Sequence, residues 1–192
     1  ARGVALAAMA SLPHITVGGA IATGTHGSGD AIGTLSSAVT GLEIVTADGE
    51  PRWVRRGVDP DFDGWVVALG ALGIVTRVEL EVEPTYDVAQ TVFAGLDLDV
   101  VEDGFDAVFG AATSVSVFTR WRPEPDAQLW LKRRIDREGV WPGGPAFGAA
   151  ERTAPLHPLE QLAEPLDFFA VPRPVAGALS VERALIGRAR LA

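Results

Sequence analysis

Residues 17–29 form the part of the sequence whose residue types are best suited to chemistry. They read Val-Gly-Gly-Ala-Ile-Ala-Thr-Gly-Thr-His-Gly-Ser-Gly, so that glycine, threonine, serine and histidine make up most of the run. Glycine adopts backbone conformations that other residues avoid. A glycine-rich turn can therefore bring main-chain N–H groups close to an anion or a polarised ring. This composition predicts a loop that binds a phosphate or such a ring, and the alternative is a plain surface loop.

Two common nucleotide-binding motifs do not fit this run. A dinucleotide-binding βαβ unit needs GxGxxG between a strand and a helix, whereas Gly24, Gly27 and Gly29 have a different spacing and no predicted helix follows them. A phosphate-binding P-loop needs a lysine after its glycines. The only lysine of the chain, Lys132, lies more than one hundred residues away.

The elements that must position the loop alternate between helical and extended patterns. We expect an α+β fold, because apolar residues recur at helical spacing in some segments and alternate with polar residues in others. Before Pro84 we expect a helix over 1–8 and a hairpin that joins strands 42–47 and 52–56 through a turn at Asp48-Gly49. A helix capped by Asp59 is expected to follow, with its apolar side formed by Phe62, Val66, Leu69 and Leu72. A strand over 74–83 completes this group.

A second group of elements is expected after Pro84. It contains strands over 88–93, 115–121 and 128–134, and an amphipathic helix over 101–112 with Phe105, Val108 and Phe109 facing inward. Prolines become frequent after Gly139 and apolar periodicity is weak, which predicts mostly irregular chain with one helix over 178–191.

Composition limits the possible functions. The 192 residues are 47% hydrophobic, enough for a core, and no run of about 18 apolar residues predicts a transmembrane helix. A net charge of −9 argues against a nucleic-acid partner, which requires a basic face. With no cysteine and three scattered histidines we expect no metal site, and the absence of cysteine is compatible with the cytoplasmic location that we expect.

Three ordered blocks of the sequence closely resemble a known family. They are residues 10–29, beginning Ala-Ser-Leu-Pro-His, then Glu-Ile-Val-Thr-Ala-Asp-Gly at 43–49, and Leu-Gly-Ala-Leu-Gly-Ile-Val-Thr at 69–76. These blocks resemble the vanillyl-alcohol-oxidase/p-cresol-methylhydroxylase (PCMH) class of FAD enzymes, and within it the alditol (xylitol) oxidases, with the sugar-lactone oxidases next to them. The stretches 115–121 and 130–134 look like the substrate domain of the same enzymes.

The resemblance implies a role for nine residues. Ser11 matches a serine that lies at the flavin and contacts the sugar alcohol, and Ile74 matches a position whose backbone holds the adenine end of FAD. The other matched positions share a place along the flavin and its phosphates: Thr16, Gly19, Ala20, Ile21, Ala22, Thr23 and Gly24. His14 and His26 are expected to be structural, each donating to loop carbonyls.

The resemblance also implies an organisation for the chain. Residues 1–84 are expected to be the C-terminal part of a PCMH-type FAD-binding domain, 85–137 the start of an antiparallel-sheet substrate domain, and 138–192 an irregular, unassigned tail. The family's histidine for covalent FAD attachment would precede Ala1, and its catalytic Glu, Arg and Lys would follow residue 192. We therefore expect a central fragment with no catalytic residue of its own.

The chemistry implied for the parent enzyme is oxidation of a polyol's terminal carbinol by FAD, with O₂ reduced to H₂O₂. The alternatives are a D-arabinono-1,4-lactone or L-gulonolactone oxidase, an inactive flavin-domain remnant or binding module, and an α+β domain without flavin whose glycine loop is structural.

Overall fold

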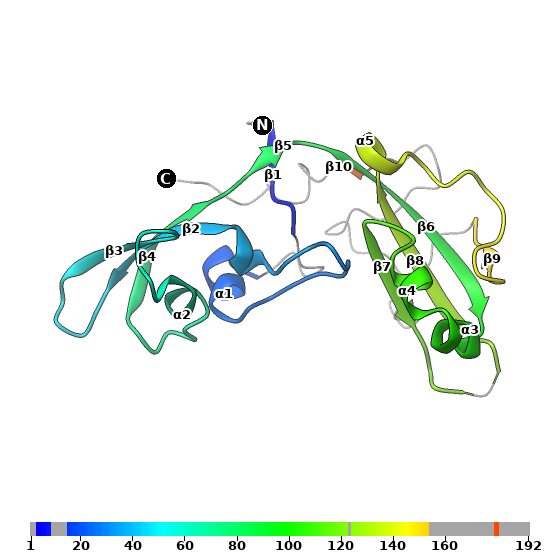
Figure 1. Ribbon diagram of the computed structural model, residues 1–192, viewed down its shortest axis with the longest axis horizontal. Coiled ribbons are helices and arrows are strands. Elements are labelled where there is room, and N and C mark those ends of the chain that lie inside the picture. The colour runs from blue at the N-terminus through cyan, green and yellow to red at the C-terminus, as the bar shows by residue number, and fades with distance from the viewer. Residues whose placement is uncertain (1–2, 9–14, 123, 154–178, 181–192) are drawn as a thin grey trace. The chain divides into compact units, whose positions relative to one another are not determined.

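The computed structural model describes residues 3–8, 15–122, 124–153 and 179–180, and forms two compact units. The N-terminal unit comprises Val4–Gly27 and Gly33–Pro84. The C-terminal unit comprises Ala1–Gly3, Ser28–Ile32 and Thr85–Ala192. Both units combine antiparallel strands with short helices (Figure 1), which confirms the expected α+β class.

The N-terminal unit is built on a three-stranded sheet of order β3-β2-β4. Its elements are β1 (Val4–Ala5), α1 (Val17–Ala22), the 3-10 helix η1 (Leu35–Ala38), β2 (Val39–Val45), β3 (Pro51–Arg55), α2 (Phe62–Val66), β4 (Ile74–Leu80) and β5 (Glu83–Pro84). β2 and β3 form the predicted hairpin, which turns at Gly49 with a φ of 83°. The side chain of Asp48 accepts from Thr46 Oγ1 and from the amide of Glu50, which closes the turn.

Two expectations for this unit were wrong. Residues 4–5, expected in a helix, form β1 and pair with β5 far along the chain. The predicted helix after Asp59 ends early, because α2 stops at Val66 and Leu69 has a φ of 52°, which no helix allows, and is 75% exposed. Asp59 does not cap this helix; its carboxylate instead accepts from the amide of Arg55 at 2.7 Å.

The C-terminal unit is built on a sheet of order β10-β6-β8-β7, with β9 also paired to β6. Its elements are β6 (Asp87–Leu96), α3 (Leu98–Asp103), α4 (Phe105–Phe109), β7 (Ser114–Phe118), β8 (Ala127–Arg134), α5 (Ile135–Glu138), β9 (Ala150–Glu151) and β10 (Leu179–Ser180). The strands β6, β7 and β8 agree with the sequence pattern. The predicted helix over 101–112 is divided at Gly104 into α3 and α4, and Phe105 is 59% exposed rather than inward.

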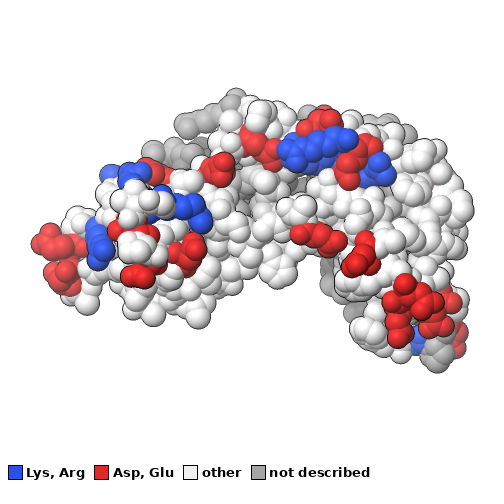
Figure 2. Space-filling model, in the orientation of Figure 1, with Lys and Arg blue, Asp and Glu red and all other residues white. Residues whose placement is uncertain are grey.

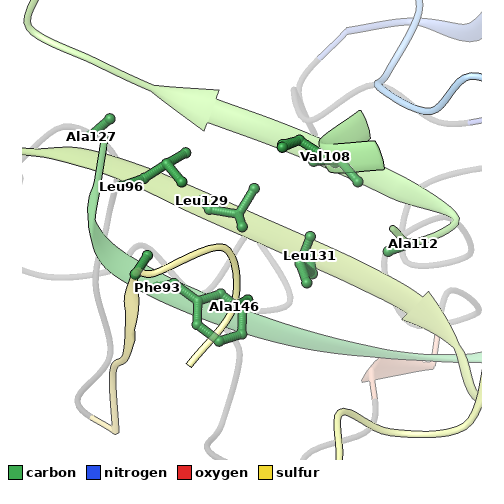
Figure 3. Packing of buried hydrophobic residues seen from close by; sticks show 10 residues of the cluster. Phe93, Leu96, Val108, Ala112, Ala127, Leu129, Leu131 and Ala146 are labelled. Carbon is green, nitrogen blue, oxygen red and sulfur yellow. The ribbon is translucent and has the colours of Figure 1, made fainter. Parts of the chain in front are cut away.

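One face of this sheet carries the hydrophobic core of the unit. Phe93, Leu129 and Leu131 lie in one cluster with Val108 of α4 (Figure 3). Val115 of β7 belongs to the same cluster, and each of these residues is at most 2% exposed. The outer surface of α3 and α4 is acidic (Figure 2), with Asp97, Asp99, Glu102, Asp103 and Asp106 exposed there. Of the helix expected over 178–191, residues 179–180 form strand β10 and the rest lie outside the described residues.

Candidate functional site: the glycine-rich segment

The glycine-rich segment begins with a short helix, α1, whose first turn is exposed. Thr16 is its N-cap, with an extended backbone, and its Oγ1 accepts from the amide of Gly19 at 3.1 Å. Val17 and Gly18 occupy the first turn, where a helix leaves N–H groups without an intrahelical acceptor. A Cβ added to Gly18 would meet no atom of the described residues within 4 Å, so the helix surface is open at this position.

The opposite side of α1 is fixed to the protein. Ala20 and Ile21 are 3% and 2% exposed, and the buried hydroxyl of Ser36 donates to the carbonyl of Ile21 at 2.8 Å. Their side chains face the interior, so a ligand on the exposed side would meet main-chain atoms of this segment. The helix therefore presents backbone and small polar groups on a well-anchored support.

The C-terminal end of α1 turns sharply at Gly24, which has a φ of 63°. The hydroxyl of Thr23 donates to the carbonyl of Gly19 at 2.9 Å and lies 3.0 Å from the hydroxyl of Thr25. The amide of Leu35 donates to the carbonyl of Thr25, which joins the end of the turn to η1. Gly24 is required here because left-handed backbone is strained in residues with a Cβ.

The end of the glycine-rich run belongs to the other unit. Ser28 Oγ lies 2.6 Å from Ser114 Oγ and 3.0 Å from Ser116 Oγ, both on β7. A Cβ on Gly29 would lie 2.3 Å from the carbonyl oxygen of Thr113, so this position also needs glycine. The sequence suggested one continuous loop over 14–33, and these contacts of Ser28 were missed because no local pattern signals a contact 86 residues away.

No contact among the described residues brings the other predicted site residues together. Ile74 begins β4 opposite Val45 and is 72% exposed. Ser11 and His14 lie outside the described residues. His26 Nδ1 donates to the carbonyl of Gly27 at 2.8 Å, which is a loop carbonyl of the kind expected for this histidine.

Two other kinds of feature are absent from the described residues. In the described ranges, no three histidine, cysteine or acidic side chains are placed to hold a metal ion. None of the helices in that part of the chain combines the length and apolar character needed to cross a membrane.

Comparison with known proteins defines the class to which this segment belongs. Residues 1–55, which include α1 and the glycine-rich run, match the family described as FAD binding domain. A solved structure of a mutant cholesterol oxidase from Brevibacterium sterolicum shares the fold, with a TM-score of 0.61 at 16% identity over 75% of this chain and 31% of that one. Residues 1–55 thus resemble an FAD-binding domain, and the chain shares its fold with the cholesterol oxidase.

Sequence relatives specify the family further. The chain is 46% identical to the alditol oxidase of a Streptomyces species over 159 residues, which is 83% of this chain and 37% of that enzyme. It is 32% identical to a putative D-arabinono-1,4-lactone oxidase of Neurospora crassa (70% and 24% covered) and 31% identical to the L-gulonolactone oxidase of Mus musculus (53% and 23%). The chain is therefore homologous to the alditol and sugar-lactone oxidases and spans well under half the length of these relatives.

Proposed function

We propose that this chain is the flavin-binding segment of an FAD-dependent oxidase of polyols, and that alditols such as xylitol are the substrate class. The observation that carries this proposal is the 46% identity to alditol oxidase over 159 residues, against 32% and 31% for the two lactone oxidases. Because the chain is also similar to the lactone oxidases, D-arabinono-1,4-lactone and L-gulonolactone are the alternative substrates.

The residues of α1 fit a bound dinucleotide. The exposed turn at Thr16–Gly19 offers main-chain donors beside small side chains, and donors of this kind suit phosphate oxygens. We assign cofactor contacts to Thr16, to the segment from Gly19 to Gly24, and to the backbone of Ile74. The anchoring of Ile21 by Ser36 supports this assignment, because a pre-organised cradle binds with a smaller ordering cost.

Bound FAD would supply the redox chemistry, which is acceptance of hydride from the carbinol carbon and reduction of O₂ to H₂O₂. This chain's own part is to hold the cofactor and orient the substrate. We assign Ser11 to a hydrogen bond with a substrate hydroxyl, and loss of such a bond costs about 1–3 kcal/mol. No residue of the chain is proposed to carry a proton in the reaction.

A chimera tests this proposal. The 159 aligned residues of the Streptomyces alditol oxidase are replaced by those of this chain, and the purified protein is examined for flavin absorbance near 450 nm and for peroxide from xylitol, sorbitol and the two sugar lactones. We expect a yellow protein that makes peroxide from the alditols. Peroxide from a lactone alone would favour the lactone oxidases, and a folded chimera without flavin would contradict the proposal in favour of an inactive remnant.

A matched pair of glycine variants tests the site itself within the chimera. Gly24 and Gly49 both have positive φ, and Gly49 lies in open space at the β2–β3 turn, apart from α1. We expect Gly24→Val to lose flavin and Gly49→Val to keep it. Normal flavin content in both variants would remove the α1 turn from the cofactor site.

Two further expectations remain proposals. We assign the protein to the cytoplasm, which fractionation of the source cells would test. We also expect no affinity for nucleic acid at a net charge of −9, and a filter-binding assay at low salt would test this.

A further inference from the structure

A row of hydrogen-bond donors crosses the face of the C-terminal sheet that lies opposite the hydrophobic core. Gln90 on β6 is paired in register with Lys132 on β8, and Lys132 is paired with Ser114 on β7. Side chains alternate between the faces of a sheet, and directly opposed residues have neighbouring Cβ atoms. Because Leu131 and Val115 point into the core, the three residues of the row share the other face.

Lys132 is the only lysine of the sequence, and it is partly buried on this face. Within the described part of the chain it has no hydrogen-bond acceptor and no carboxylate partner. Burial lowers the pKa of its ammonium group, since desolvation disfavours the charged form. A bound oxyanion would stabilise the charged form of an ammonium group in this position.

The side-chain amide of Gln90 also lacks a hydrogen-bond acceptor among the described residues. Its Nε2 is buried and has no hydrogen-bond partner among the residues that the structure describes. Buried amide groups are nearly always paired in native proteins, so a buried donor of this kind calls for an acceptor from outside the present contacts. Two neighbouring residues in register therefore both lack an acceptor.

The third member of the row extends the set of donors. Ser114 shares a hydroxyl cluster with Ser28, whose Oγ also lies 3.0 Å from that of Ser116. Hydroxyls can donate as well as accept. The row thus offers an ammonium, an amide NH₂ and hydroxyl groups, and it contains no carboxylate.

We propose that Gln90, Lys132 and Ser114 bind a compact oxyanion, either a phosphate or a carboxylate group. Lysine binds such groups as a point charge, and the neutral donors fix their orientation. This site belongs to the C-terminal unit, whereas the flavin contacts are assigned to α1 of the N-terminal unit. It does not depend on the proposed oxidase activity, so either proposal can fail alone.

The single lysine gives a direct test. Reductive methylation with ¹³C-formaldehyde labels only Lys132 and the terminal amine, which titrate differently. The Lys132 resonance of the chain is then followed while inorganic phosphate, acetate or chloride is added at constant ionic strength. We expect a saturable shift with phosphate or acetate, and whichever anion acts identifies the group. Equal and unsaturable shifts with all three salts would overturn the proposal.

Two variants separate binding from structure. Gln90→Met removes the unpaired amide at similar volume, and we expect the dissociation constant of the active anion to rise about tenfold, equivalent to about 1.4 kcal/mol, without loss of thermal stability. Arg77→Gln removes an exposed cation of the N-terminal unit and should change nothing. An unchanged constant in Gln90→Met would also overturn the site.

Discussion

Gly73 is the position where a single methyl group should disturb the sheet of the N-terminal unit most. It precedes β4 with a φ of 147°, and a Cβ added there would lie 2.3 Å from the carbonyl oxygen of Val45. Alanine at positive φ costs about 1 kcal/mol. Because backbone cannot move aside cheaply, the clash should also break the pairing of Val45 with Ile74, for about 1–2 kcal/mol more. We expect Gly73→Ala to cost about 2–3 kcal/mol in total.

A neighbouring glycine supplies the control. Gly70 lies in the same loop with a φ of 77°, and a Cβ added to it would meet no atom within 4 Å. Gly70→Ala should therefore cost only the backbone term, about 1 kcal/mol. The comparison isolates the contact with Val45 from the effect of positive φ.

Native-state hydrogen exchange provides the assay, because it reads β2 and β4 without depending on the other unit. With about 1.4 kcal/mol per factor of ten, the amides of these strands should exchange about 30–150 times faster in Gly73→Ala and about 5 times faster in Gly70→Ala. Equal acceleration in the two variants would refute the argument from the Val45 contact. Acceleration confined to the C-terminal unit would refute the assigned location.

Three further predictions concern other parts of the chain. Thr16→Ala should destabilise α1 by about 1 kcal/mol through loss of the cap on Gly19, and Thr16→Ser should restore it, as measured by amide exchange in α1. Gly19→Ala places a Cβ 2.9 Å from Thr16 Oγ1, so it should be better tolerated in the Thr16→Ala background, where a double-mutant cycle would show coupling. The hydrogen bond from Arg134 lowers the pKa of Asp136. This pair therefore stabilises the fold above the unfolded pKa, and the effect is lost as pH falls through the folded pKa. Asp136→Asn should destabilise at pH 7 and match the wild type in acid unfolding curves below the folded pKa of Asp136.

Local sequence determined the elements whose signals are local. The β2–β3 hairpin follows from Asp48-Gly49, because the turn needs positive φ and a side-chain acceptor at adjacent positions. The β7–β8 pair follows from alternating residues on each side of a proline-containing turn. The resemblance to FAD enzymes rests on motifs in the same continuous blocks, and the family match over residues 1–55 confirms it.

Tertiary structure decided the features that depend on distant partners. Residues 4–5 look helical in isolation, and pairing with β5 overrides this local preference. The assignment of Ser28 to the C-terminal unit depends on hydroxyls 86 and 88 residues away. The register that sets Gln90, Lys132 and Ser114 in one row spans three strands, and a shift of one residue would move Lys132 to the other face. Periodicity can show that a strand has two faces, whereas only the assembled sheet fixes which residues of different strands become neighbours.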